Sequence, residues 1–227
     1  MDNPIQKLIE ENFRQRQQQA KYHNFFSIEV FIDDPLPEHV DLNKVFSFIN
    51  RRVPPYILEL VEEVRIGSYR ELEDRHINAM YSDGVIYITN DQKSNDDAID
   101  DIIHELAHAV EDHYGKEIYL SGDIKQEFLG KRKKLERLLR YMDYDTHLHD
   151  FENPQYLKKF DFFLLKDVGY DIIESLTIGL FINPYAATSL REYFATGFED
   201  YYLNNGDYIR ETSPQLYRVL EELNNME

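Results

Sequence analysis

Two histidines stand four residues apart in the pentapeptide His104-Glu105-Leu106-Ala107-His108, inside an apolar stretch with helical spacing. Side chains at positions i and i+4 of an α-helix lie one above the other, so both imidazoles can bind one metal ion. Glu105 points about 100° further round the helix, where it can reach a water on the metal but not the metal itself. The pentapeptide therefore predicts a helix whose polar face is turned toward a cleft.

The residues on either side of the pentapeptide also predict a helix. Asn95 or Asp96 is the expected N-cap, acidic residues suit the positive first turn, and Gly115 is the expected stop. The alternative interpretation is a helix with two part-exposed histidines and a salt-bridging glutamate, and without a metal. An apolar stripe at helical spacing would seat the helix against a core: Ile99, Ile102, Ile103, Leu106, Ala107 and Val110.

A β-hairpin is predicted immediately before this helix. The runs Ala79–Ser82 and Val85–Thr89 flank Asp83-Gly84, a dipeptide that favours a two-residue hairpin turn. If Val85–Thr89 is an edge strand, an extended peptide or protein substrate can add to it as a further strand. The alternative is that Val85–Thr89 is an internal strand.

A catalytic metal site needs three protein ligands and an open position. Zinc, one ion per chain, is the expected metal because it is redox-inert, binds nitrogen and oxygen, and lowers the pKa of its water to about 7. Glu192 lies in a predicted helix, Ala187–Tyr202, one turn before the small residue Ala195, and could project toward another helix. An ordinary surface carboxylate is the alternative. The candidates for the third ligand include Glu117, Glu127, His147, His149, Asp150, Glu174 and Glu192.

Two motifs together resemble a known family. H-E-L-A-H at 104–108 and E-Y-F-A-T-G-F at 192–198 are similar to the minigluzincin metallopeptidases, which comprise the catalytic domain of anthrax lethal factor (ATLF-like) and the secreted Pro-Pro endopeptidases. The resemblance implies a zincin-like fold and Glu192 as the third zinc ligand. It also implies an oxyanion-binding tyrosine two helical turns earlier, which falls on Tyr185. A core aromatic is the other interpretation of Tyr185.

The chain departs from this resemblance in two places. His108 and Glu192 are 84 residues apart (192 − 108), about twice the interval that the resemblance implies. The excess, residues 116–181, is expected to be a helical insertion, and a ligand from it would displace Glu192. We also expect the chain to differ from the secreted relatives in having no secretion signal, since residues 1–20 are polar and Gln-rich.

Charge and composition narrow the expected partners. A formal net charge of −18 argues against nucleic acid and anionic membranes, and favours neutral or basic peptides. The chain has no cysteine, which excludes disulfides and thiolate ligands, and no apolar run long enough to span a membrane. We expect a cytoplasmic protein (in the host cytoplasm if the source is viral). The oligomeric state stays open.

The predicted fold class is α+β: a minigluzincin-type zincin fold with a small twisted mixed sheet, backing and active-site helices, and a mainly helical C-terminal half. We expect a single domain with an N-terminal helix at 1–24, the sheet and active-site helix at 25–115, the insertion at 116–181, and the third-ligand and C-terminal helices at 182–227. Further strands are expected at Ser27–Ile32 and Leu60–Gly67, and further helices at Ile5–Lys21, Asp41–Arg52, Asp123–Tyr141, Pro154–Val168, Asp171–Phe181 and Pro214–Asn224.

Two other clusters have alternative meanings. The basic run Lys131-Arg132-Lys133-Lys134, with Arg137 and Arg140, is expected to be a solvated helix face, and docking to an acidic partner is the alternative. The segment that holds Asp143, Asp145, His147, His149 and Asp150 is expected to be an exposed polar loop, with a second metal site near His147 and His149 as the alternative.

These observations lead to a functional hypothesis, a zinc-dependent endopeptidase. His104, His108 and Glu192 would hold zinc, Glu105 would be the general base, and Tyr185 would help to bind the oxyanion. The rival from another class is a catalytically degenerate zincin that acts as a binding or toxin-like interaction module. Amide hydrolysis on a non-peptide substrate is a weaker third interpretation.

Overall fold

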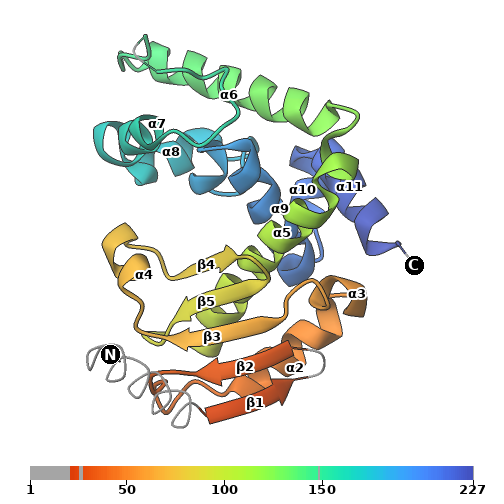
Figure 1. Cartoon of the computed structure of the whole chain (residues 1–227). Helices are drawn as coiled ribbons and strands as arrows, with labels where there is room; N and C mark the ends of the chain where they lie inside the picture. Colours follow the sequence, from red (N-terminus) through yellow and green to blue (C-terminus); the bar gives the residue numbers. More distant parts are fainter. Residues whose placement is uncertain (1–20, 26–27, 148, 227) are drawn as a thin grey trace, which may run out of the picture. The chain divides into compact units, whose positions relative to one another are not determined.

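The computed structural model describes residues 21–25, 28–147 and 149–226. The chain divides into two compact units, Met1–Ala109 and Val110–Glu227, each of which is described by itself; the single domain expected from the sequence stays a prediction. Most of the predicted N-terminal helix lies outside the described residues. Its predicted end is wrong, because Lys21–Phe25 form strand β1 (Figure 1).

The first unit contains a mixed five-stranded sheet in the order β1-β2-β3-β5-β4. The β1–β2 and β4–β5 pairs are antiparallel, whereas β3 pairs in parallel with both β2 and β5. The small mixed sheet and the α+β class are therefore confirmed. After β1, the strands are β2 (Ile28–Ile32), β3 (Glu63–Gly67), β4 (Ala79–Ser82) and β5 (Val85–Thr89).

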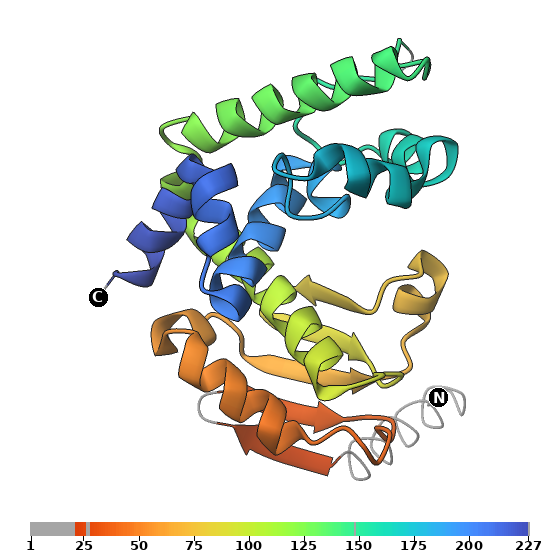
Figure 2. The ribbon, with the colours of Figure 1, turned by 180° about the vertical axis from the view of Figure 1, so that it is seen from behind.

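Helices α2 (Leu42–Arg52) and the first part of α5 (Asn95–Tyr119) cover one face of this sheet (Figure 2). The strands bury alternate residues, as expected for a sheet with one covered face. Two short helices complete the unit, α3 (Pro55–Leu58) and α4 (Arg70–Arg75), and neither was predicted. The buried sheet residues include Val30, Val64, Ile66, Ile86 and Ile88, and the helices contribute Val45, Phe46, Ile49, Ile102 and Ile103.

The predicted hairpin is confirmed. Asp83 and Gly84 both have positive φ, 48° and 83°, as a type I′ turn requires. Its strands pair in the register that the turn imposes, with Ser82 opposite Val85. The hairpin joins β4 and β5 and leads into α5.

Helix α5 begins where it was expected but is capped and ended differently. The Ser94 hydroxyl accepts a 3.1 Å hydrogen bond from the Asp97 amide, so Ser94 has the capping role predicted for Asn95 or Asp96. Gly115 does not stop the helix. The backbone leaves helical geometry at Tyr114 (φ −109°, ψ 16°), and helical structure then continues to Tyr119.

The second unit is mainly helical, as predicted for the C-terminal half. The predicted bounds are confirmed for α6 and α11, whereas the region before α9 is more broken than expected. Gly169, at φ 91°, separates a π-helical segment from α8. In the described residues, no helix is long and apolar enough to cross a membrane. After α5 the elements are α6 (Asp123–Tyr141), α7 (Lys158–Phe162), the π-helical η1 (Phe163–Gly169), α8 (Tyr170–Thr177), the 3₁₀ helix η2 (Tyr185–Ala187), α9 (Leu190–Asn204), α10 (Asp207–Thr212) and α11 (Pro214–Asn224).

Gly197 shows why the second sequence motif contains a glycine. It lies inside α9, and a Cβ at this position would overlap Cδ2 of Leu216 in α11. Glycine is unfavourable inside a helix, by about 1 kcal/mol relative to alanine. Close packing of α9 against α11 explains its presence here, so this motif residue has a structural role.

The basic run on α6 is not a uniformly solvated face. Lys131 and Arg132 are buried, which makes the prediction wrong for these two residues, whereas Lys133 and Lys134 are exposed. Lys131 donates hydrogen bonds to the carbonyl oxygens of Leu180 and Thr212 and to the Ser213 hydroxyl, and burial lowers the pKa of Lys131 to about 8.

Arg132 is fully buried. It donates to the carbonyl oxygens of Asn153 and Asp150, and its guanidinium carbon lies 3.9 Å from the Phe160 ring centroid. Arg132 therefore ties the segment before α7 to α6.

Replacing Arg132 by alanine should destabilise the protein by about 3–5 kcal/mol, because it opens a cavity beside Phe160 and leaves two carbonyls without donors. Chemical unfolding measures this change. Lys133→Ala, on the exposed side of the same helix, should alter the unfolding free energy by no more than about 0.5 kcal/mol. Equal effects of the two substitutions would contradict the structural role of Arg132.

Candidate metal centre

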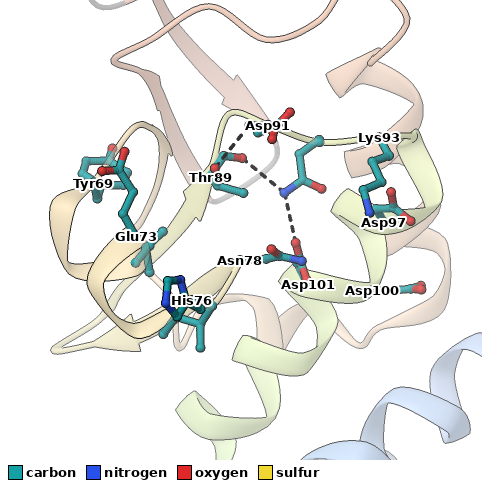
Figure 3. A pocket seen from close by; sticks show the side chains of 13 residues that line it. Tyr69, Glu73, His76, Asn78, Thr89, Asp91, Lys93, Asp97, Asp100 and Asp101 are labelled. Carbon is teal, nitrogen blue, oxygen red and sulfur yellow. Dashed lines mark hydrogen bonds between the residues drawn. The ribbon is translucent and has the colours of Figure 1, made fainter. Parts of the chain in front are cut away.

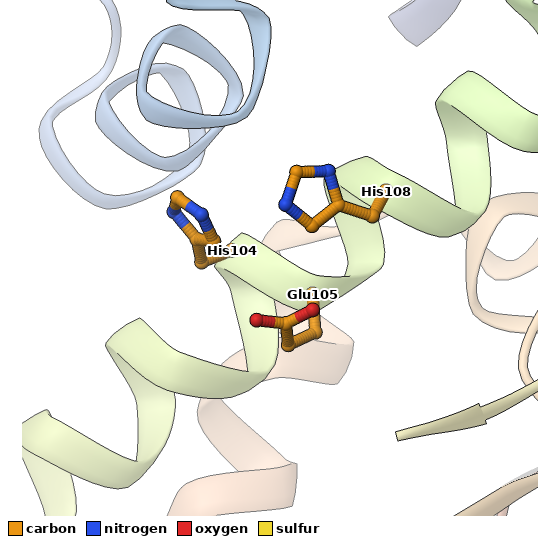
Figure 4. A group of neighbouring side chains, drawn as sticks. All are labelled: His104, Glu105 and His108. Carbon is orange, nitrogen blue, oxygen red and sulfur yellow. The ribbon is translucent and has the colours of Figure 1, made fainter. Parts of the chain in front are cut away.

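His104, Glu105 and His108 form a compact cluster in the first unit (Figure 4). One ligand atom from each side chain lies within 4.8 Å of the others. The two imidazole centroids are 5.1 Å apart, and the rings are nearly perpendicular. Glu105 and His108 are only 7% and 8% exposed, so two polar side chains are held in a largely dry environment. Burying such groups is costly unless they have partners.

The Glu105 carboxylate is anchored by the backbone of the hairpin. The amide of Tyr81 in β4 donates a 2.7 Å hydrogen bond to Glu105 Oε2. This bond orients the carboxylate without using another side chain. Sequence inspection could not find it, because any residue other than proline supplies the same amide.

The predicted peptide-binding edge at Val85–Thr89 is wrong. These residues form β5, which pairs with β3 on one side and β4 on the other, so its backbone groups are used by the sheet. The edge strands of the described sheet are β1 and β4 (Ala79–Ser82), and β4 is the one beside β5. The turn pairs β4 with β5, and the further pairing of β5 with β3 leaves the first hairpin strand as the outer one.

Asp101, one helical turn before Glu105, is half-buried and electrostatically coupled to the cluster. Burial, and to a smaller extent the negative charge of Glu105, raise the pKa of Asp101 to about 6. A hydrogen bond from Gln92 Nε2, 3.0 Å long, and the nearby His104 oppose this increase. The cluster is therefore continuous with an acidic surface on the preceding turn of α5.

Glu192 is described in the second unit, in the first turn of α9. Ser189 caps this helix, and its hydroxyl accepts a 3.1 Å hydrogen bond from the Glu192 amide. The sequence Ser189-Leu190-Arg191-Glu192 has the spacing of a capping box, a signal that places the helix start at Leu190 rather than at the predicted Ala187. Glu192 is half-buried.

Arg191, which precedes Glu192 in the sequence, links α9 to the last turns of α5 within the second unit. Arg191 Nε lies 3.2 Å from Glu111 Oε2, and the Tyr119 hydroxyl donates a 2.5 Å hydrogen bond to Glu111 Oε1. Burial, followed by the charge of Glu111, raises the pKa of Tyr119, and Glu192 contributes in the same direction. Glu192 therefore lies in an acidic, half-buried environment that Arg191 partly neutralises.

Tyr185 is also described in the second unit, half-buried in the short helix η2. The Thr188 hydroxyl donates a 2.8 Å hydrogen bond to the Tyr185 carbonyl, and Ser189 then starts α9. The tyrosine and Glu192 are therefore carried by separate helices. Tyr170 is close enough for Tyr185 to contribute, after burial and Asp161, to the raised pKa of Tyr170.

Several alternative third ligands have structural roles. Both oxygens of Glu127 accept hydrogen bonds at the start of α11 from the amides of Gln215 and Leu216, and one also accepts from Tyr193. Asp150 Oδ1 accepts from the amides of Glu152 and Asn153. The His149 ring stacks on Phe163 at 3.9 Å, and burial lowers the pKa of His149. Glu117 and Glu174 are exposed.

Within residues 21–25, 28–147 and 149–226, one group of three or more potential ligands converges, and it is His104, Glu105 and His108. His147 and His149 do not belong to such a group. Two imidazoles with carboxylates nearby, and no thiolates, form a donor set that zinc accepts. Comparison with protein-family models, curated proteins and solved structures finds no match for this chain.

Proposed function

We propose that this protein is a zinc-dependent endopeptidase with a zincin-like fold. The observation that carries the proposal is the cluster of His104, Glu105 and His108 on one helix, with Glu105 held by the amide of the edge strand β4. The geometry supports a metal site with an acid–base carboxylate beside it. The motif resemblance supplies the reaction class.

In this proposal, His104, His108 and Glu192 hold one zinc ion. Zinc, when bound, supplies a Lewis acid and lowers the pKa of a water molecule in the open position. Glu105 accepts the proton of the attacking water and delivers it to the leaving amine. The Tyr185 hydroxyl donates a hydrogen bond to the oxyanion. Support for the two histidines and Glu105 comes from their geometry, and support for Glu192 and Tyr185 comes from the second motif.

The edge strand β4 is the proposed surface for an extended peptide. The Thr89 amide donates to the Asn78 carbonyl, so Asn78 and Thr89 form a hydrogen-bonded pair. Because such pairs alternate along an antiparallel ladder, the backbone groups of Ala79 and Tyr81 point to the outer edge. The Tyr81 amide reaches Glu105 there, which places the general base beside this edge.

Tyr185→Phe should lower kcat about 100-fold or more and leave the zinc content unchanged, because it removes one oxyanion donor and no metal ligand. Steady-state kinetics and metal analysis of the same preparation measure both quantities. A wild-type kcat in this variant would return Tyr185 to a purely structural role.

Digestion of a diverse synthetic peptide library tests the proposed activity. Protein loaded with one equivalent of zinc should cleave internal peptide bonds, chelation should abolish cleavage, and added zinc should restore it. Peptide binding without cleavage in the zinc-loaded protein would favour the binding-module interpretation and contradict the proposal.

A further inference from the structure

A polar cavity of about 510 Å³ lies in the first unit, at the beginning of α5 and of β4 (Figure 3). Asp101 contributes to its wall from the helical turn that precedes Glu105, and Asn78 contributes from the position just before β4. Helix α5, which carries the general base, and the residue that leads into β4 therefore form part of the wall, and α4, the end of β5 and the loop before α5 form the rest. Its carboxylates are Glu73, Asp91, Asp97, Asp100 and Asp101.

The charge of this lining is strongly unbalanced. Against five carboxylates, Lys93 is the one lysine or arginine in the wall, and its side chain is exposed. Gln92, only 3% exposed, adds a second signal. Its Nε2 donates to the Thr89 carbonyl and to Asp101, but the buried Oε1 has no hydrogen-bond partner in the described part of the chain. An unused acceptor in an acidic wall matches a ligand that only donates hydrogen bonds.

The geometry distinguishes an organic cation from a metal ion. Three ligand atoms that converge within 4.8 Å occur in the described residues at His104, Glu105 and His108, and not among the cavity carboxylates. Carboxylates spread around about 510 Å³ fit a long side chain with a charged end better than a single ion.

The distance along the strand between Asn78 and Tyr81 shows how far the cavity lies from Glu105. Asn78 is three residues before Tyr81, whose amide binds Glu105, and three residues of strand span about 10 Å. A peptide extended along β4 would therefore carry a side chain into the cavity two or three residues from the bond above Glu105.

We propose that this cavity is a specificity subsite for a lysine or arginine side chain of the peptide substrate, two or three residues from the cleaved bond. The inference rests on the proposed peptidase function and adds the substrate class. The net charge of −18 acts in the same direction, because it attracts basic peptides over longer distances.

A position-scanning peptide library and a matched pair of variants test the subsite. Zinc-loaded wild type should show an enrichment of lysine and arginine, and a depletion of glutamate, at one position near the cleaved bond. Asp97→Asn should lower kcat/KM about fivefold for a lysine-containing peptide and less than twofold for the same peptide with alanine. Asp96→Asn removes the same charge from the same helical turn but lies outside the cavity wall, and it should leave both values unchanged.

The failure of the subsite and the failure of the peptidase function give different results. Cleavage without charge preference at any position would overturn the subsite and leave the function intact. If no peptide is cleaved, the binding of fluorescent peptides that contain lysine or glutamate tests the subsite by itself. A preference for the lysine peptide that Asp97→Asn weakens and Asp96→Asn leaves unchanged would support the subsite. Equal binding of the two peptides would overturn it. Calcium binding that Asp97→Asn abolishes, without any preference for basic peptides, would replace the subsite with an ion site.

Discussion

Glu105→Gln should lower kcat by about 10²–10⁴-fold or more while the protein retains its zinc. Glutamine has nearly the same shape as glutamate and can still accept the hydrogen bond from the Tyr81 amide, so the α5–β4 contact should persist. It cannot accept a proton from water. The substitution therefore separates acid–base chemistry from folding and from metal binding. Peptide cleavage assays measure kcat, and metal analysis of the same preparation measures the zinc content.

Glu117→Gln is the matched control, because Glu117 lies on the same helix and is exposed. It should keep the wild-type rate and zinc content. Full peptidase activity in Glu105→Gln would remove the glutamate from the mechanism. Loss of zinc from Glu105→Gln would show instead that this carboxylate is a metal ligand.

Glu192→Ala has the second large expected effect, a loss of zinc affinity of about 100-fold or more. Removing groups that only orient zinc ligands already costs about 10–100-fold, and the loss of a direct ligand should exceed that. Competition with a chromophoric chelator measures the dissociation constant. Turnover should fall with zinc occupancy and recover only partly at high zinc concentration.

Glu199→Ala controls for the loss of a carboxylate from α9, because Glu199 lies on the same helix and is half-buried like Glu192. Its zinc affinity should equal that of the wild type. If Glu192→Ala also binds zinc normally, the third ligand comes from elsewhere, and the segment 116–181 would be the first place to search.

The parts of the fold that local chemistry determines could be predicted from the sequence. The Asp83-Gly84 turn sets the hairpin register, because both residues tolerate positive φ. The histidine spacing in α5 likewise determines which side chains share a face, and the structure confirms the cluster at His104, Glu105 and His108. These features depend on residues within one or two turns of one another.

Features that depend on distant partners could not be predicted in the same way. Val85–Thr89 has the composition of either an edge strand or an internal strand, and only its pairing with β3 makes it internal. Arg132 and Lys133 are both strongly basic, yet Arg132 is buried because the backbone carbonyls of Asp150 and Asn153 receive its donors. The Glu105 carboxylate is oriented by a hydrogen bond from the backbone amide of Tyr81, and no side chain in the sequence indicates this bond.

A crystal structure of the zinc-loaded protein, with anomalous scattering recorded at the zinc absorption edge, tests the central claim most directly. We expect one strong peak about 2.0–2.2 Å from a nitrogen of His104, a nitrogen of His108 and a carboxylate oxygen of Glu192. A zinc ion bound by the two histidines with Glu192 turned away from it, or no ion at the histidines at all, would contradict the proposed zinc site.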